Sequence, residues 1–138
     1  QRTASRPTRA RPTAVSRIMP ALLRYTLVGA FATGAHYALL MACVEFGHWP
    51  AYAASGFGAV VGAQLAYAGN RWFTFAHHGG LPASWMKFQG TAVLGALVGM
   101  LIVGLGVKVG VHYLLAQVCA TLFVLGLTFA INRHWTFR

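Results

Sequence analysis

The chain has 138 residues, of which 57% are hydrophobic, and its 11 Lys and Arg residues against a single acid give a net charge of +10. Charged residues make up 9% of the chain, whereas a soluble domain has about 25%, so the composition excludes a soluble enzyme. Because Glu45 is the only acid, chemistry that needs two carboxylates and cation sites built from carboxylates are excluded as well.

The first twenty residues differ in character from the rest of the chain. Residues 1–20 are rich in Arg, Thr, Pro, Ala and Ser and show no hydrophobic period, so we expect a disordered, basic cytoplasmic tail. We expect its arginines to contact anionic lipid headgroups, at about 1 kcal/mol for each base, and not nucleic acid.

Four hydrophobic segments follow, each close to the roughly 20 residues that a membrane-crossing helix needs. They cover residues 25–44, 51–69, 88–107 and 113–131. His36 is the only histidine or charged residue inside them, and the lack of alternation between polar and apolar residues argues against a β-barrel. We therefore predict an all-α membrane protein in which residues 21–138 form one domain of four transmembrane helices.

The distribution of the bases predicts the orientation of these helices. Ten of the eleven bases precede the first segment, lie between the second and third, or follow the fourth. The two remaining loops hold Lys108 and the single acid. Cytoplasmic loops carry the excess of Lys and Arg in membrane proteins, so we expect both termini in the cytoplasm.

The sequence also contains an internal repeat. The second and fourth segments both end in the motif aromatic-Ala-x-Asn-Arg-x-aromatic-Thr-Phe, at residues 67–75 and 129–137, which is an offset of 62 residues. The first and third segments begin with Leu23-Arg24-Tyr25 and Met86-Lys87-Phe88, at an offset of 63. We predict two helical hairpins with the same orientation, related by a pseudo-two-fold axis along the membrane normal.

Small residues and tryptophans are placed as in a packed helical bundle. Gly58 and Gly62, and likewise Gly95 and Gly99, have the four-residue spacing that lets helices approach closely in lipid. These glycines serve packing inside the bundle or homodimerisation. All four tryptophans lie near segment ends, where they are expected to anchor the protein at the interface. Trp72 and Trp135 are alternatively candidates for stacking on a sugar ring.

Four bases fall at the cytoplasmic ends of the predicted helices. They are Arg24, Arg71, Lys87 and Arg133, and no acid lies near them in the sequence. A ring of such bases would bind an external anion, and a phosphate suits arginine because two N–H groups can bind it together. Asn70 and Asn132 precede the two arginines of the repeat and would bind phosphate or sugar hydroxyls, or cap their own helices. The alternative interpretation is that the bases only fix the topology.

Several polar residues lie within the hydrophobic segments. His36 is near the middle of the first segment, where an ionisable group indicates either a functional role or a neutral imidazole bonded to a neighbouring backbone. Gln64, Gln89 and Gln117 would bond between helices or line a polar groove. Cys43, Cys119 and the remaining histidines lack the spacing of metal ligands, so we expect no metal or cofactor.

The chain resembles a known family, the GtrA family of small membrane proteins. The resemblance rests on four spans in a short chain, on Arg-Tyr-x-x-Val-Gly at residues 24–29, and on the paired Asn-Arg-x-aromatic-Thr-Phe motifs. It covers residues 22–137. It implies a role in bacterial cell-envelope polysaccharide synthesis, such as O-antigen glucosylation, at the cytoplasmic membrane.

The resemblance further implies the flipping of a polyprenyl-phosphate-linked monosaccharide, such as an undecaprenyl phosphate sugar, after a membrane glycosyltransferase has made it. The residues that it implies for the head group are Arg24, Asn70, Arg71, Lys87, Asn132 and Arg133. An alternative role within the family is a membrane anchor that recruits the glycosyltransferase. A small multidrug exporter would need a membrane-buried acid, and an enzyme would need a nucleophile and base, so we expect neither.

Overall fold

The computed structural model describes residues 14–74 and 81–135, with side chains described for residues 19–20, 22–73 and 85–130. Within these residues the chain forms four α-helices and a short π-helix, and no strand. They are α1 (Ala14–Glu45), α2 (Ala51–Gly69), the π-helix η1 (Asn70–Thr74), α3 (Leu81–Lys108) and α4 (Tyr113–Trp135). The all-α fold class predicted from the sequence is confirmed.

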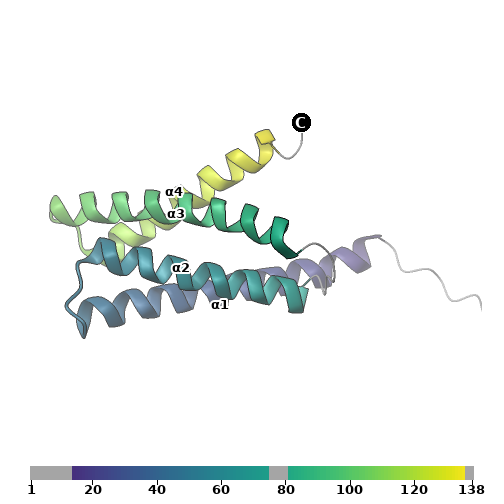
Figure 1. The fold of residues 1–138 in the computed structure, drawn as a ribbon, viewed down its shortest axis with the longest axis horizontal. Coiled ribbons are helices and arrows are strands. Elements are labelled where there is room, and N and C mark those ends of the chain that lie inside the picture. Colours follow the sequence, from purple (N-terminus) through teal and green to yellow (C-terminus); the bar gives the residue numbers. More distant parts are fainter. Residues whose placement is uncertain (1–13, 75–80, 136–138) are drawn as a thin grey trace, which may run out of the picture.

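The helices lie lengthwise in one bundle, and its two ends differ (Figure 1). One end, here called the loop end, carries the two short connections at residues 46–50 and 109–112. The other, here called the basic end, carries Arg24, η1, the first turns of α3 and the last turns of α4. The chain therefore forms two hairpins, α1–α2 and α3–α4, that run in the same direction along the bundle.

Two helices begin earlier than the sequence analysis predicted. α1 begins at Ala14, so residues 14–20 are helical and the predicted disordered tail is too long, while residues 1–13 lie outside the described part. The helix continues through Pro20, because one proline removes a single backbone hydrogen bond and the turns on either side can hold the helix. α3 begins at Leu81 instead of near Phe88, and proline as its second residue is compatible with a first helical turn.

Three helices are long and apolar enough to cross a membrane: Leu22–Glu45, Trp85–Lys108 and Tyr113–Ala130. α2 occupies the predicted residues and has no charge, but it is not one of these three, because it contains several glycines together with serine, glutamine and two tyrosines. Ala54, Ser55, Gly56, Gly58 and Gly62 of α2 are buried, and small residues that pack against neighbouring helices do not need to be strongly apolar.

Glycines bring α1 and α2 into close contact. A Cβ atom added at Gly58 would lie 2.5 Å from His36 Cδ2 and 2.8 Å from the His36 carbonyl oxygen. A Cβ atom at Gly62 would lie 3.1 Å from the carbonyl oxygen of Ala32. The predicted packing role of this glycine pair is therefore confirmed. In the second pair, Gly95 lies against Val124 of α4, whereas Gly99 has no atom near its missing Cβ.

The tightly packed part of the bundle lies between its middle and the loop end. Every residue that is buried among the described side chains falls there, from Ala32 and Gly62 at mid-bundle to Val103 and Ala116 near the loops. The burial follows the internal repeat. Leu40 and Val103, which are 63 residues apart like the starts of the two hairpins, are both 0% exposed.

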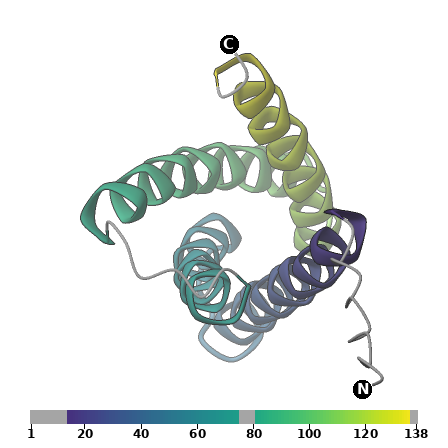
Figure 2. The ribbon, with the colours of Figure 1, turned by 90° about the vertical axis from the view of Figure 1, so that its right-hand side faces the viewer.

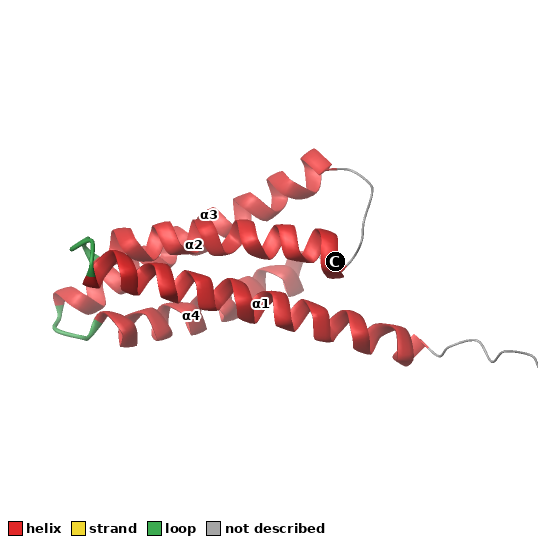
Figure 3. Ribbon diagram, turned by 90° about the horizontal axis from the view of Figure 1, so that it is seen from below, coloured by secondary structure: helices red, strands yellow, loops and turns green. Residues whose placement is uncertain are grey.

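The half of the bundle at the basic end is more open. α4 turns away from α1 and α2 toward its C-terminus (Figure 2), and the first turns of α3 lead away from the end of α2 (Figure 3). α4 packs extensively against α3 alone within the described residues. α4 is thus joined to the first hairpin toward the loop end and diverges from it toward the basic end, whereas α3 stays in contact with α2.

Candidate functional site

Arg24 connects α1 with the first copy of the repeated Asn-Arg motif. Its Nη1 atom donates a hydrogen bond of 3.5 Å to the carbonyl oxygen of Phe73. Its guanidinium carbon also lies 5.4 Å from the centroid of the Phe73 ring, within the range of a cation–π interaction. Arg24 remains exposed, so its outward N–H groups are accessible to a ligand.

The motif itself continues α2 as a π-helix. Asn70 has α-helical dihedrals, and its backbone N–H is bonded to the carbonyl oxygens of Ala66 and Tyr67. The wider turn of η1 then carries Arg71, which is half-buried, and Phe73 toward α1. A side chain at Gly69 would collide with Val28 of α1, so a glycine here permits η1 to lie directly on α1. π-turns of this kind occur often at functional sites.

The other predicted head-group residues lie at the same end of the bundle. Lys87 is exposed in α3, two residues beyond the exposed Trp85. Asn132 and Arg133 belong to the last turns of α4, but their side chains, and that of Trp135, lie outside the described part. The structure therefore brings Arg24 and η1 together and places Lys87 at the same end, while the closure of a four-base ring stays a prediction.

The only acid of the chain is at the opposite end. Glu45 ends α1 and accepts a hydrogen bond of 2.6 Å from the hydroxyl group of Tyr113, which begins α4. It thus lies at the loop end, whereas Arg24, Arg71 and Lys87 lie toward the basic end. No carboxylate side chain of the protein can neutralise these bases, which leaves their charge for an external anion.

Two of the predicted groove residues form a pair between α2 and α3. Gln64 and Gln89 exchange two hydrogen bonds of 2.9 Å, each amide nitrogen donating to the other's oxygen. The rings of Tyr67 and Phe88, which lie beside this pair, are 5.5 Å apart. These contacts hold α2 to α3 immediately inside the basic end.

The other two groove residues belong to a second polar cluster nearer the loop end. His36 Nε2 lies 3.1 Å from the carbonyl oxygen of Ser55, and the Ser55 hydroxyl group donates a hydrogen bond of 2.5 Å to Gln117 Oε1. Gln117 Nε2 donates to Thr121 Oγ1 at 3.3 Å, and that oxygen is 2.8 Å from the Tyr37 hydroxyl group. The cluster connects α1, α2 and α4.

Tyr37, Ser55 and Thr121 of this cluster were not predicted from the sequence. One sequence feature could have found Ser55, because it precedes Gln117 by 62 residues, the offset of the repeated motif. No buried side-chain nitrogen or oxygen among the described residues lacks a partner. In this conformation His36 and the three glutamines therefore bond to neighbouring helices, as the structural alternative predicts, and do not line an empty polar groove.

A match that extends over both hairpins identifies the family. A model of the GtrA/DPMS transmembrane domain matches residues 24–137. The chain belongs to this family. The match begins at Arg24 and includes both copies of the Asn-Arg motif. Comparisons with curated proteins and with solved structures gave no match.

As a GtrA/DPMS transmembrane domain, the chain is a multi-pass membrane protein of glycosyl-lipid-related processes. Its aromatic residues suit such an environment. Trp49 and Trp85 are each partly exposed near a helix end, and Trp72 is 75% exposed in η1, as expected of interfacial anchors. Trp72 also lies outside the bundle core and next to Arg71, and its role in sugar stacking stays a prediction. The described residues contain no cluster of metal-binding side chains.

Proposed function

We propose that this protein moves a polyprenyl-phosphate-linked monosaccharide across the bacterial cytoplasmic membrane, with the basic end in the cytoplasm. One observation carries the proposal. The half of the bundle where the helices diverge is also the half where Arg24, Arg71 and Lys87 lie without an acid. A lipid phosphate supplies the missing negative charge, and its hydrocarbon chain can remain in the bilayer beside the helices.

The contacts at the basic end assign roles to its residues. Arg71 and the exposed N–H groups of Arg24 bind the phosphate, assisted by Lys87 and, from the second copy of the motif, by Arg133. Asn70 and Asn132 bind the phosphate or the sugar hydroxyl groups. The Gln64–Gln89 pair is the next polar feature toward the membrane interior, and amides that exchange bonds with each other can exchange them with sugar hydroxyl groups. No bond of the substrate is made or broken, so the protein acts without catalysis.

Passage to the other leaflet then requires the loop end to open. Polar side chains link α4 to the first hairpin there through Ser55–Gln117 and Tyr37–Thr121. Hydrogen bonds between transmembrane helices contribute only about 0.6 kcal/mol each on average. Such bonds can break and reform as the two hairpins rock against each other, which would expose the head group alternately to the two sides.

The test is the movement of the head group in proteoliposomes that contain only the purified protein. We expect an Arg71→Ala/Arg133→Ala double variant to lose at least about tenfold in rate, because each arginine–phosphate bond contributes about 1.5–3 kcal/mol. A matched control is Arg9→Ala/Arg11→Ala, which removes the same charge ahead of the first transmembrane helix. Normal flipping by the motif variant, or equal loss in both variants, would contradict the phosphate-binding role.

A second candidate function is an anchor for a membrane glycosyltransferase. The second half of α4 supports it, because Leu122, Phe123, Leu125 and Phe129 are exposed there and α4 packs extensively against α3 alone. A transmembrane helix of another protein could cover this surface. The anchor role predicts that polar substitutions at Phe123 and Phe129 abolish co-purification with the glycosyltransferase while the motif arginines are dispensable. The transport role predicts the opposite pattern for flipping.

A further inference from the structure

α3 carries a lysine at each end of its hydrophobic stretch. Lys87 and Lys108 are three heptads apart, which corresponds to about 30 Å of helix, the thickness of the hydrocarbon core. Residues seven apart lie almost on one line along a helix. The two intermediate positions of this line are Leu94 and Leu101, which are 45% and 62% exposed. An exposed apolar track thus joins a base at one membrane surface to a base at the other.

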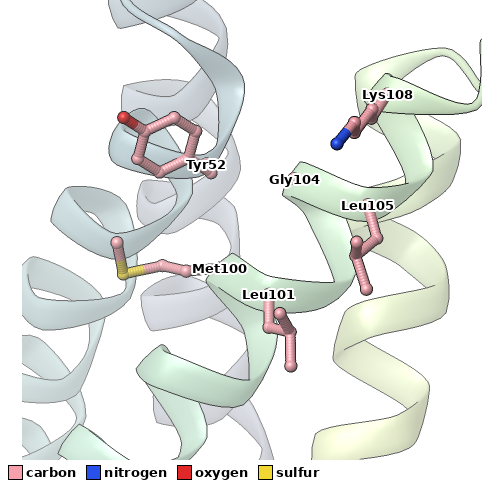
Figure 4. Close-up of a pocket in the computed structure, with 6 residues that line it drawn as sticks. All are labelled: Tyr52, Met100, Leu101, Gly104, Leu105 and Lys108. Carbon is pink, nitrogen blue, oxygen red and sulfur yellow. The ribbon is translucent and has the colours of Figure 1, made fainter.

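The track ends in a groove at the loop end, between α3 and the start of α2 (Figure 4). The groove has a volume of about 410 Å³ and is lined by Tyr52, Met100, Leu101, Gly104, Leu105 and Lys108. Ligand sites commonly have volumes from about 300 to 1,000 Å³. Gly104 forms part of its wall, and a Cβ atom there would lie 3.5 Å from Tyr52 Cβ. The absence of a side chain at this position helps to keep the groove open.

Lys108 provides the one charged group of the groove. Figure 4 shows its amine directed toward the space over Gly104, with Tyr52 on the far side. Glu45, the only acid of the chain, does not line the groove, and its carboxylate accepts a hydrogen bond from Tyr113. A cation above an apolar groove is complementary to an anionic head group with a hydrocarbon chain.

We propose that this groove binds the polyprenyl-phosphate lipid at the second leaflet, with the chain against Leu101 and Leu105 and the phosphate on Lys108. The inference rests on the proposed function and adds its release site. The groove accommodates the segment of a single chain next to the head group, and its one amine meets one phosphate. Lys87 and Lys108 then mark the start and the end of the path of the phosphate along α3.

Binding can be tested without transport, in nanodiscs that expose both leaflets. The full chain is placed in phosphatidylcholine nanodiscs with a polyprenyl phosphate that carries a photoreactive diazirine on its chain, and the labelled residues are mapped by mass spectrometry. We expect labels at Tyr52, Leu101 or Leu105. Gly104→Leu fills the groove and should lower this labelling severalfold. The matched control is Gly126→Leu on α4, where no atom lies within 4 Å of the added Cβ.

The phosphate contact is tested with Lys108→Gln, which should weaken binding of the probe at the loop end about fivefold, the equivalent of about 1 kcal/mol for one base. Lys108→Arg should retain it. Phosphatidylglycerol should compete poorly with unlabelled polyprenyl phosphate. Unchanged labelling in both Gly104→Leu and Lys108→Gln would overturn the site, and so would equal competition by phosphatidylglycerol.

The same variants separate this inference from the proposed function. If the wild-type protein flips the lipid in proteoliposomes while Gly104→Leu and Lys108→Gln change neither labelling nor flipping, the release site is refuted and the transport role stands. If the loop end is labelled with the expected dependence while the wild-type protein does not flip the lipid, the site stands and the transport role fails.

Discussion

Replacement of Gly58 by alanine should destabilise the bundle although alanine favours helices. The added Cβ would lie 2.5 Å from His36 Cδ2 and 2.8 Å from the His36 carbonyl oxygen, whereas carbon atoms in contact are normally about 3.5–4.0 Å apart. α1 and α2 must therefore separate by about 1 Å at this point. The bond of 3.1 Å between His36 Nε2 and the Ser55 carbonyl oxygen would then exceed hydrogen-bond range.

The magnitude follows from three terms. Overpacking costs about 1–3 kcal/mol, the lost hydrogen bond costs about 1 kcal/mol, and the change from glycine to alanine in a helix returns about 1 kcal/mol. We expect the free energy of unfolding to fall by about 1–3 kcal/mol. It can be measured by reversible denaturation in micelles, with circular dichroism at 222 nm as the probe of helix content.

Gly34→Ala is the matched control. Gly34 belongs to the same hairpin, in α1, but no atom lies within 4 Å of a Cβ added there. Its free energy of unfolding should stay the same or rise by up to about 1 kcal/mol. Opposite signs for the two variants are thus the expected result. Equal effects, or a stabilised Gly58→Ala variant, would refute the close approach of α1 and α2 on which the argument depends.

Variants at Gln64 and at Arg24 test the contacts nearer the basic end. Gln64→Leu should lower the free energy of unfolding by about 1–3 kcal/mol, because it leaves the amide of Gln89 without its partner. The Gln64→Leu/Gln89→Leu double variant should be nearly as stable as the wild type. Additive losses in the single and double variants would contradict the reciprocal pair. If the double variant is stable but does not flip the lipid, the amides also serve the head group. Arg24→Lys keeps the charge but not the planar contact with Phe73, so lipid binding should fall less than in Arg24→Ala, and equal losses would show that the guanidinium geometry matters more than the charge.

The sequence predicted the helices well because each physical cause is local. A long apolar run and a basic flank need no knowledge of the partner helix, and α2 begins and ends where its apolar run does. The start of α1 was misplaced because residues 14–20 lack a continuous apolar run, although the helix includes them and passes through Pro20. The small residues of α2 pack closely against its neighbours, a tertiary contact that the composition of the helix alone could not show.

The candidate site was predictable in its residues but not in its contacts. The repeat identified Asn70 and Arg71, and the charge distribution identified Arg24. The π-turn that brings Phe73 onto Arg24 depends on the close approach at Gly69, which is a tertiary contact. In the same way, three glutamines were selected as polar residues in apolar segments, but their partners depend on which helices pack together, which is also a tertiary property. Gln64 met Gln89, and Gln117 met Ser55.

The hydrogen bond between Ser55 and Gln117 depends on a difference between the two hairpins. The two residues are 62 apart and occupy equivalent positions in the two hairpins, so in a symmetric dimer of a single hairpin this position would face its own copy. Two serines would be too short to meet there, and two glutamines would compete for one space. A chain that joins both hairpins can place a short donor on one side and a long acceptor on the other, an asymmetric solution that identical subunits cannot encode.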